Sequence, residues 1–217
     1  MRLYFFRVCL LIAAVLLTGC AAPKSYDYAA LKQSKPRSIL VLPPLNNSPD
    51  IRATYSFMAT VTTPLAESGY YVFPVALVDQ TFKENGLPNA GEMHQAPIGK
   101  IAEIFGADAA LYITVDQYGA QYQLLDSSVT VSANARLIDT RSGQLLWEGK
   151  ASASSAENDM NNSGSVLGML ISGLIKQIAN SIGDKGYPIA RITSARLLTA
   201  KPGGLLHGPR SPRYEKD

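Results

Sequence analysis

The sequence predicts a single α/β domain in which helices pack on a mixed β-sheet. In the first half of the chain, short apolar runs alternate with segments whose apolar residues recur every three or four positions. That pattern is typical of strands connected by helices and favours parallel pairing. Between residues 111 and 155 the pattern changes to alternating β-branched and aromatic residues, which favours antiparallel hairpins. The length agrees with one domain and short tails, because the 217 residues leave 198 once the first 19 are removed.

The first 19 residues have the layout of a bacterial signal peptide. Arg2 and Arg7 precede the apolar run 8–17, whose length of about ten residues is below the roughly 18–20 that span a bilayer. The run ends in Leu17-Thr18-Gly19-Cys20, which resembles the lipobox of bacterial lipoproteins. The resemblance implies cleavage between Gly19 and Cys20 and acylation of Cys20 with a diacylglyceryl group and a palmitate. An ordinary secretory signal, in which Cys20 follows the apolar run by coincidence, is the alternative.

The residue after Cys20 and the cysteine count indicate the compartment of the mature protein. Ala21 is neutral, which resembles lipoproteins sorted to the outer membrane of Gram-negative bacteria rather than those that an acidic residue retains in the inner membrane. Cys9 and Cys20 are the only cysteines, so the mature domain can form neither a disulfide nor a thiolate metal site. We expect a lipid-anchored outer-membrane protein whose domain faces the periplasm or the cell exterior. Three acyl chains would make membrane attachment effectively permanent.

Two segments outside the predicted domain lack the pattern of a packed core. Residues 20–37 are expected to form the lipidated N-terminus and a flexible tether, because they contain two prolines and no long apolar period. Such a tether would reach no more than roughly 55–60 Å. Residues 200–217, with three prolines and three glycines, are expected to form a disordered tail. The α/β domain is accordingly placed at 38–199.

The first half of the domain is predicted to contain two strands and three helices. Residues 38–42 form an uninterrupted apolar run closed by two prolines, which is typical of a strand covered on both faces. A helix is expected from 51 to about 65, and Pro64 is expected to kink or end it. Its buried face is predicted to contain Ile51, Tyr55, Met58, Val61 and Leu65. The remaining elements are a strand at 70–74, a helix at 75–83, a loop at 87–95 and a helix at 98–105 that Gly106 ends.

The second half of the domain is predicted to consist of strands and a final helix. The expected elements are strands at 111–115, 121–125, 129–138 and 144–152 and a helix at 187–198. The loop 139–143, with Gly143 near its end, is typical of a hairpin, and Leu145 and Trp147 are expected to share a face of the strand that follows. Alternation places five apolar side chains of the preceding strand on one face: Val129, Val131, Ala133, Ala135 and Leu137.

Three segments resemble a known family of lipoproteins. They are 67–75 (ESGYYVFPV), 105–113 (FGADAALYI) and 139–147 (DTRSGQLLW). Together they look like the outer-membrane lipoproteins of unknown function typified by a meningococcal vaccine-candidate antigen, and the resemblance extends from about residue 35 to residue 198. More distantly, the pattern resembles the amino-terminal domain of TolB and the periplasmic domain of CsgG. In those domains a Gly-Ala-Asp turn precedes a strand, and an Asp-x-x-Ser/Thr-Gly hairpin joins two strands.

The family resemblance implies a cell-envelope protein that is not an enzyme. It implies a component of a multi-protein transport or secretion system, with envelope partners such as a CsgG-type lipoprotein and with no catalytic residues to carry over. Gly106 at a helix end and Gly143 in a hairpin are each explained by backbone geometry without any ligand.

Residues that bear chemistry are few. The segment 86–92 has the glycine spacing of a phosphate loop, but Glu92 stands where lysine is required. His94 and His207 are the only histidines, and we interpret His94 as a solvated loop residue. Asp108, Asp116 and Asp126 are interpreted as separate carboxylates at turns or strand ends. We therefore expect no catalytic residue, no metal site and no cofactor. A net charge of +3 without clustered basic residues predicts no nucleic-acid partner.

The apolar stretch 166–175 allows three interpretations: core packing on the sheet, a subunit interface, or contact with membrane lipid. It is too short to span a bilayer. As an interface it predicts a homodimer or a higher homo-oligomer that uses Val166, Leu167, Leu170, Ile171 and Leu174.

Two functions remain open at this point. The first is a non-enzymatic envelope lipoprotein that assembles with itself and with envelope partners. The second is a lipoprotein with a ligand- or glycan-binding site that regulates a cell-wall enzyme. Tyr112, Tyr118 and Tyr122 near one strand junction would line a groove in the second case.

Overall fold

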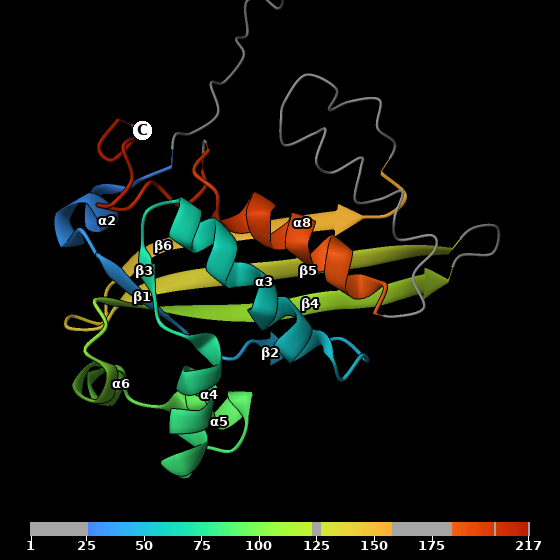
Figure 1. The fold of residues 1–217 in the computed structure, drawn as a ribbon, viewed down its shortest axis with the longest axis horizontal. Coiled ribbons are helices and arrows are strands. Elements are labelled where there is room, and N and C mark those ends of the chain that lie inside the picture. The colour runs from blue at the N-terminus through green and yellow to red at the C-terminus, as the bar shows by residue number, and fades with distance from the viewer. Residues whose placement is uncertain (1–25, 123–126, 158–183, 202, 217) are drawn as a thin grey trace, which may run out of the picture.

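The computed structural model describes residues 26–122, 127–157, 184–201 and 203–216 (Figure 1). Within them, the strands form one mixed sheet: β1 (Ser38–Val41), β2 (Leu45–Asn46), β3 (Tyr71–Val72), β4 (Ala109–Tyr122), β5 (Ser127–Asp139) and β6 (Leu145–Ser154). The strand order is β3-β1-β4-β5-β6, and β2 also pairs with β4. β1 is parallel to β3 and β4, β2 is parallel to β4, and the β4–β5 and β5–β6 pairs are antiparallel. The predicted fold class is therefore confirmed.

Helices cover both faces of the sheet (Figure 1). α3 (Ala53–Glu67) and α8 (Gly186–Leu198) pack side by side on one face. The other face carries α4 (Val75–Glu84), α5 (Ala90–Gln95) and α6 (Ile98–Phe105). The expected loop at 87–95 thus contains a short helix, which begins where the Asn89 side chain accepts a hydrogen bond from the backbone N–H of Glu92 at 3.0 Å. Among these described residues, no helix has the length and hydropathy to cross a membrane.

β1 lies inside the sheet and is buried on both faces, as the apolar run predicted. Ile39 and Val41 belong to the core under α3 and α8, whereas Leu40 and Leu42 belong to the core under α4, α5 and α6. Successive side chains of a strand point to opposite faces, so one short run contributes to both cores.

A bulge in β4 decides which face its side chains reach. The register with β5 shifts between Val115 and Gln117, and the extra residue reverses the alternation of faces. Tyr118 therefore packs on the α3 and α8 side, whereas Tyr112 packs on the opposite side. The groove expected from Tyr112, Tyr118 and Tyr122 is wrong for the first two, and the side chain of Tyr122 lies outside the described residues. The segments 111–115 and 121–122 also belong to one long strand rather than two.

The buried face of α3 differs from the prediction. Ile51 is 90 % exposed in the turn before the helix, and Tyr55 is 50 % exposed. At the surface, the Tyr55 ring lies 5.3 Å from the ammonium group of Lys83 on α4. The same ammonium group donates to the Tyr55 hydroxyl at 3.1 Å. The core-facing residues of α3 are Ala53, Phe57, Met58, Thr60, Val61, Pro64 and Leu65.

Pro64 neither ends nor interrupts α3, which continues to Glu67. A proline has no N–H, so the carbonyl of Thr60 loses the donor that an ordinary residue at position 64 would supply. Ser194 of α8 offers a substitute donor, because its hydroxyl lies 3.2 Å from the Thr60 oxygen in a buried position and shares its hydrogen between that oxygen and the Arg191 carbonyl at 3.1 Å. The proline is thus accommodated where two helices touch.

The predicted face of β5 is confirmed, whereas that of β6 is partly wrong. Val129, Val131, Ala133, Ala135 and Leu137 all lie in the core under α3 and α8. Leu145 and Trp147 differ, since Leu145 is 38 % exposed and Trp147 is 1 % exposed. The register of the β5–β6 pair shifts between Leu137 and Ile138, and this shift breaks the alternation of faces between Leu145 and Trp147.

The two segments expected to be a flexible tether and a disordered tail fold against each other where the structure describes them. α2 (Ala29–Ser34) buries Leu31, and the tail buries Leu205. The Tyr28 hydroxyl donates to the Gly204 carbonyl at 2.6 Å, which joins the two segments directly. We call residues 26–37 and 201–216 together the α2/tail end. It lies at the opposite end of the sheet from the last residues of β4 and the first residues of β5 (Figure 1).

The tail is held by backbone hydrogen bonds that no hydrophobic period reveals. Gly208 N–H donates to the Ser68 carbonyl at 2.7 Å, and the Tyr70 hydroxyl donates to the Leu206 carbonyl at 2.7 Å. Gly69, at φ +94°, leaves room for this contact, since a Cβ at that position would overlap Ser211. Only a few apolar side chains and backbone groups fix the tail, which is why composition alone predicted disorder.

Candidate functional site

Two of the three segments that carry the family resemblance, 105–113 and 139–147, meet at one corner of the sheet. Thr140, which is 1 % exposed, donates from its hydroxyl to the carbonyl oxygens of Ala107 and Asp108. Its backbone N–H donates to the Asp108 carbonyl at 3.0 Å. The Asp139 carboxylate closes the hairpin by accepting from Ser142 N–H at 2.8 Å. We call this arrangement the Asp108 corner.

The Asp108 carboxylate fastens the start of the domain to this corner. It accepts from the backbone N–H groups of Arg37 and Ser38 at 3.0 and 3.1 Å, and Arg141 forms an ion pair with it at 2.6 Å. Burial raises the pKa of Asp108, but the hydrogen bonds from Arg37 and Ser38 and the charge of Arg141 outweigh burial and hold that pKa below its usual value. The Asp108 corner therefore holds the start of β1 next to the hairpin between β5 and β6 through the backbone of Arg37 and Ser38 and the side chain of Arg141.

The other singled-out carboxylates have no shared site in the described chain. Asp116 accepts from the Asn134 side chain at 2.9 Å, far along β4 from Asp108. Asp126 lies outside the described residues. No group of three His, Cys, Asp or Glu side chains suitable for a metal ion occurs within the part of the chain that the structure describes.

A second polar cluster lies toward the opposite end of the sheet, and of its side chains the sequence analysis singled out only Tyr118. The hydroxyls of Ser56 and Tyr118 both donate to one carboxylate oxygen of Asp184, at 2.7 and 2.6 Å. Its other oxygen accepts from Gly186 N–H at 2.9 Å. Asp184 thereby connects α3, β4 and α8. An aspartate two residues before a helix is a common N-terminal signal, so the sequence could have indicated Asp184 as a helix start but not its two partners.

A hollow of about 570 Å³ opens beside this cluster. Asp50 and Arg52 form an ion pair at 2.6 Å along one wall, and Ile51 between them is 90 % exposed. We call it the Asp184 hollow, and its walls also include Tyr118, Gly119, Asp184 and Gly186.

The Asp184 hollow presents a neutral phenol and an ionised carboxylate. Burial, together with the hydrogen bond to Asp184, raises the pKa of Tyr118, so its phenol stays protonated near neutral pH. The hydrogen bond from Arg52 lowers the pKa of Asp50, which is therefore ionised. Neither histidine lines the hollow. The hydroxyl of Ser56 donates to the Asp184 carboxylate, which also accepts from Tyr118 and from the backbone N–H of Gly186.

His94 is not the solvated loop residue that the sequence predicted. It lies in α5 and is partly buried, with its ring edge on Tyr112 at 5.2 Å between ring centres and an interplanar angle of 90°. Its Nε2 is 2.9 Å from the Pro43 carbonyl, which can only accept, so Nε2 carries the proton. Burial lowers the pKa of His94, and the bond to Pro43 offsets this in part. The neutral ring therefore ties α5 to the segment after β1.

The α2/tail end contains a second cavity, of about 340 Å³. Leu31, Tyr70 and Leu206 supply its apolar walls, while Lys35 and Glu215 form an ion pair at 2.6 Å beside them. His207, the second histidine, also lines this cavity.

The predicted attachment and interface residues lie outside the described residues. This applies to Gly19 and Cys20 at the signal cleavage position. It applies equally to the proposed interface residues Val166, Leu167, Leu170, Ile171 and Leu174.

The fold and the Asp108 corner define a single α/β domain whose characteristic motifs hold the sheet together. A family model described as "Putative lipoprotein GNA1162-like" matches residues 26–210, and the chain belongs to this family. The resemblance expected from the three segments is thereby confirmed.

Two relatives come from Neisseria meningitidis. The chain is 49 % identical over 203 residues to the lipoprotein NMB1124/NMB1162 of serogroup B, covering 92 % of this chain and 94 % of the relative. The crystal structure of lipoprotein GNA1162 is 53 % identical, covers 67 % of this chain and 100 % of its own, and superimposes with a TM-score of 0.54. The PelC dodecamer from Paraburkholderia phytofirmans is 13 % identical over 80 % of this chain and 91 % of its own, with a TM-score of 0.43.

Proposed function

We propose that this protein is a lipid-anchored component of the outer membrane that acts by docking rather than by catalysis, within a multi-protein transport or secretion assembly. Membership of a lipoprotein family and the lipobox at Cys20 support the anchor. The Asp184 hollow supports docking, because it combines the Asp50–Arg52 ion pair with the exposed side chain of Ile51. The Asp184 carboxylate beside them is already held by three donors of this chain.

The separation of the two ends of the domain is the observation that carries this proposal. The lipid attaches on the N-terminal side of Tyr26, and Tyr26 packs at the half of β6 nearer the α2/tail end, where its hydroxyl accepts from Glu148 N–H at 2.8 Å. The Asp184 hollow is lined by residues of the turn before α3, of the last part of β4 and of the start of α8, and Ile51 is exposed at its rim. These segments lie toward the other end of the sheet (Figure 1). An anchor at one end would present the hollow away from the membrane, where a partner protein can reach it.

The docking proposal is tested by crosslinking in the cell envelope. A photoreactive amino acid at Ile51 should form a stoichiometric adduct with a transport or secretion protein. The same amino acid at Gln80, exposed on α4, is the matched control and should form none. If the adduct at Ile51 instead contains a cell-wall enzyme or a small ligand, it would support the alternative function, a ligand-binding regulator of a cell-wall enzyme. The groove of tyrosines expected for that alternative is not formed by Tyr112 and Tyr118. Adducts of equal yield at both positions would contradict a specific docking site.

We also propose that the apolar stretch 166–175 contributes a subunit interface, through Val166, Leu167, Leu170, Ile171 and Leu174. Leu170→Asp would bury an unpaired charge between subunits and should yield monomers with native circular dichroism. Loss of ellipticity in that variant would indicate core packing instead. A wild-type protein that is monomeric at high concentration in sedimentation would contradict the interface.

A further inference from the structure

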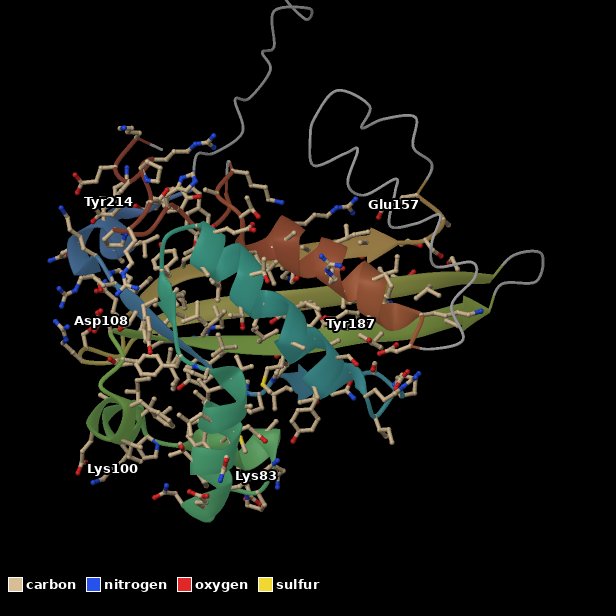
Figure 2. All side chains as sticks on the ribbon, viewed as in Figure 1. Lys83, Lys100, Asp108, Glu157, Tyr187 and Tyr214 are labelled. Carbon is tan, nitrogen blue, oxygen red and sulfur yellow. The ribbon has the colours of Figure 1, made fainter. Side chains whose placement is uncertain are left out.

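The chain segregates its charge between its terminal segments and its domain. Residues 20–37 and 200–217 contain eight lysine and arginine residues and three acidic residues, whereas residues 38–199 contain ten and fourteen. Because α2 and the tail pack together, the structure gathers most of this positive charge at the α2/tail end. Figure 2 shows side-chain nitrogens around that end, near Tyr214. The basic residues that the structure describes there are Lys32, Lys35, Arg37, Lys201, Arg210, Arg213 and Lys216.

Few of these charges have a carboxylate partner among the residues that the structure describes. Among the described residues of the α2/tail end, only Lys35 forms an ion pair, with Glu215. In the rest of the described chain, five basic residues are paired with carboxylates: Arg52, Lys83, Lys100, Arg141 and Arg196. An exposed aromatic ring adjoins the same end, since Tyr71 is 42 % exposed and lies 5.4 Å from the guanidinium of Arg210.

The attachment point limits how far this end can lie from the membrane. Tyr26 follows Cys20 by six positions, so the connection spans no more than about 22 Å whatever its conformation. This is less than half of the roughly 55–60 Å that residues 20–37 would span if all of them were extended. A basic surface held so close to a bilayer faces its lipid headgroups, with which it interacts within a screening length of about 8–10 Å.

We propose that the α2/tail end docks on anionic phospholipid headgroups of the leaflet that holds the Cys20 acyl chains. The inference rests on the lipid anchor of the proposed function and adds an orientation to it. Unpaired lysine and arginine side chains bind lipid phosphates, and Tyr71 with Arg210 is suited to the headgroup region, where aromatic and basic side chains concentrate. The acidic remainder of the domain is repelled by the same surface, so both ends favour one orientation.

The absence of cysteine from the mature domain provides a clean test. The full-length lipoprotein is reconstituted into vesicles of phosphatidylcholine, with or without phosphatidylglycerol. A single thiol is introduced at Gln33, exposed on α2, or at Gln117, exposed on β4, and is labelled with a fluorophore. Nitroxide lipids in the headgroup region then quench whichever label lies at the surface. We expect several-fold stronger quenching at Gln33 than at Gln117 in the anionic vesicles, and a loss of that difference in about 1 M salt, where the screening length is about 3 Å.

Charge variants separate lipid docking from mere proximity. The triple variant Lys32→Gln, Arg213→Gln and Lys216→Gln should lose the quenching at Gln33. The matched control, Lys83→Gln, Lys100→Gln and Lys185→Gln, should retain it, and circular dichroism verifies that both variants are folded. Quenching at Gln33 that is equal with and without phosphatidylglycerol, or equal at both labels, would overturn the inference.

The failure of the anchor is distinguishable from the failure of docking. If the protein does not float with either type of vesicle, it carries no lipid, and the proposed function fails. If it floats but the Gln33 label remains unquenched in anionic vesicles, the anchor stands and the docking is refuted.

Discussion

Replacing Asp108 by alanine should destabilise the domain far more than removing its ion-pair partner Arg141. The Asp108 side chain is 16 % exposed and accepts three hydrogen bonds from Arg37 and Ser38, whereas the Arg141 side chain is 75 % exposed. A hydrogen bond to a charged acceptor contributes about 1.5–3 kcal/mol, but water partly replaces it at the exposed Arg37 N–H. We therefore expect Asp108→Ala to cost about 2–4 kcal/mol of a total near 5–15 kcal/mol. An exposed ion pair contributes about 0–1 kcal/mol, so Arg141→Ala should cost less than about 1 kcal/mol.

Urea unfolding of residues 26–217 measures both free energies. The fluorescence of Trp147, the single tryptophan and 1 % exposed, reports the transition together with circular dichroism. The pH dependence supplies a further check. The pKa of Asp108 lies below its usual value in the folded state, so its contribution is complete above about pH 4 and is lost as the pH falls through the folded pKa. Equal losses in Asp108→Ala and Arg141→Ala would refute the conclusion that backbone hydrogen bonds dominate the corner.

Three further predictions concern the packing of the domain. A chain of residues 35–199 should melt well below one of residues 26–217, because it loses the buried Leu31 and Leu205 at about 1.5–3 kcal/mol each; equal melting temperatures would contradict the packed termini. Ser194→Ala should cost about 1–3 kcal/mol by leaving the Thr60 carbonyl unpaired, and adding Pro64→Ala should restore stability; urea unfolding of the double variant that shows no recovery would argue against this bond. Burial lowers the pKa of His94, so the free energy of unfolding should fall as the pH drops below about 6.5, and His94→Gln should flatten that slope in a pH series of thermal melts; an unchanged slope would exclude His94 as its source.

Local patterns predicted the parts of the fold that depend on neighbouring residues. The hairpin at 139–143 and the end of α6 at Gly106 follow from short-range backbone geometry, and both are confirmed. The faces of β5 and of β1 also follow from simple alternation.

Alternation failed where one extra residue entered a strand. The bulge at Val115 and Gln117 places Tyr112 and Tyr118 on opposite faces, although both positions have the same parity in the sequence. In α3, Pro64 was expected to interrupt the helix because its compensating donor, Ser194, lies 130 positions away.

The Asp184 cluster and the charge of the α2/tail end were missed for a similar reason. Ser56, Tyr118 and Asp184 come from three distant elements, and no spacing in the sequence connects them. The basic residues fall in two groups at opposite ends of the chain, neither of which is a cluster alone. Only the contact of Tyr28 with Gly204, and others like it, brings the two groups together.

The lipid on Cys20 is the claim on which the proposed function and the orientation of the domain both depend. Intact-mass and peptide mass spectrometry of the mature protein, purified from membranes, tests it directly. The account predicts an N-terminal residue at Cys20 that carries a diacylglyceryl group and a palmitate, with residues 1–19 absent, and it predicts that Cys20→Ser abolishes this mass. A mature N-terminus at any other residue, or an unmodified Cys20 in the membrane fraction, would contradict the account.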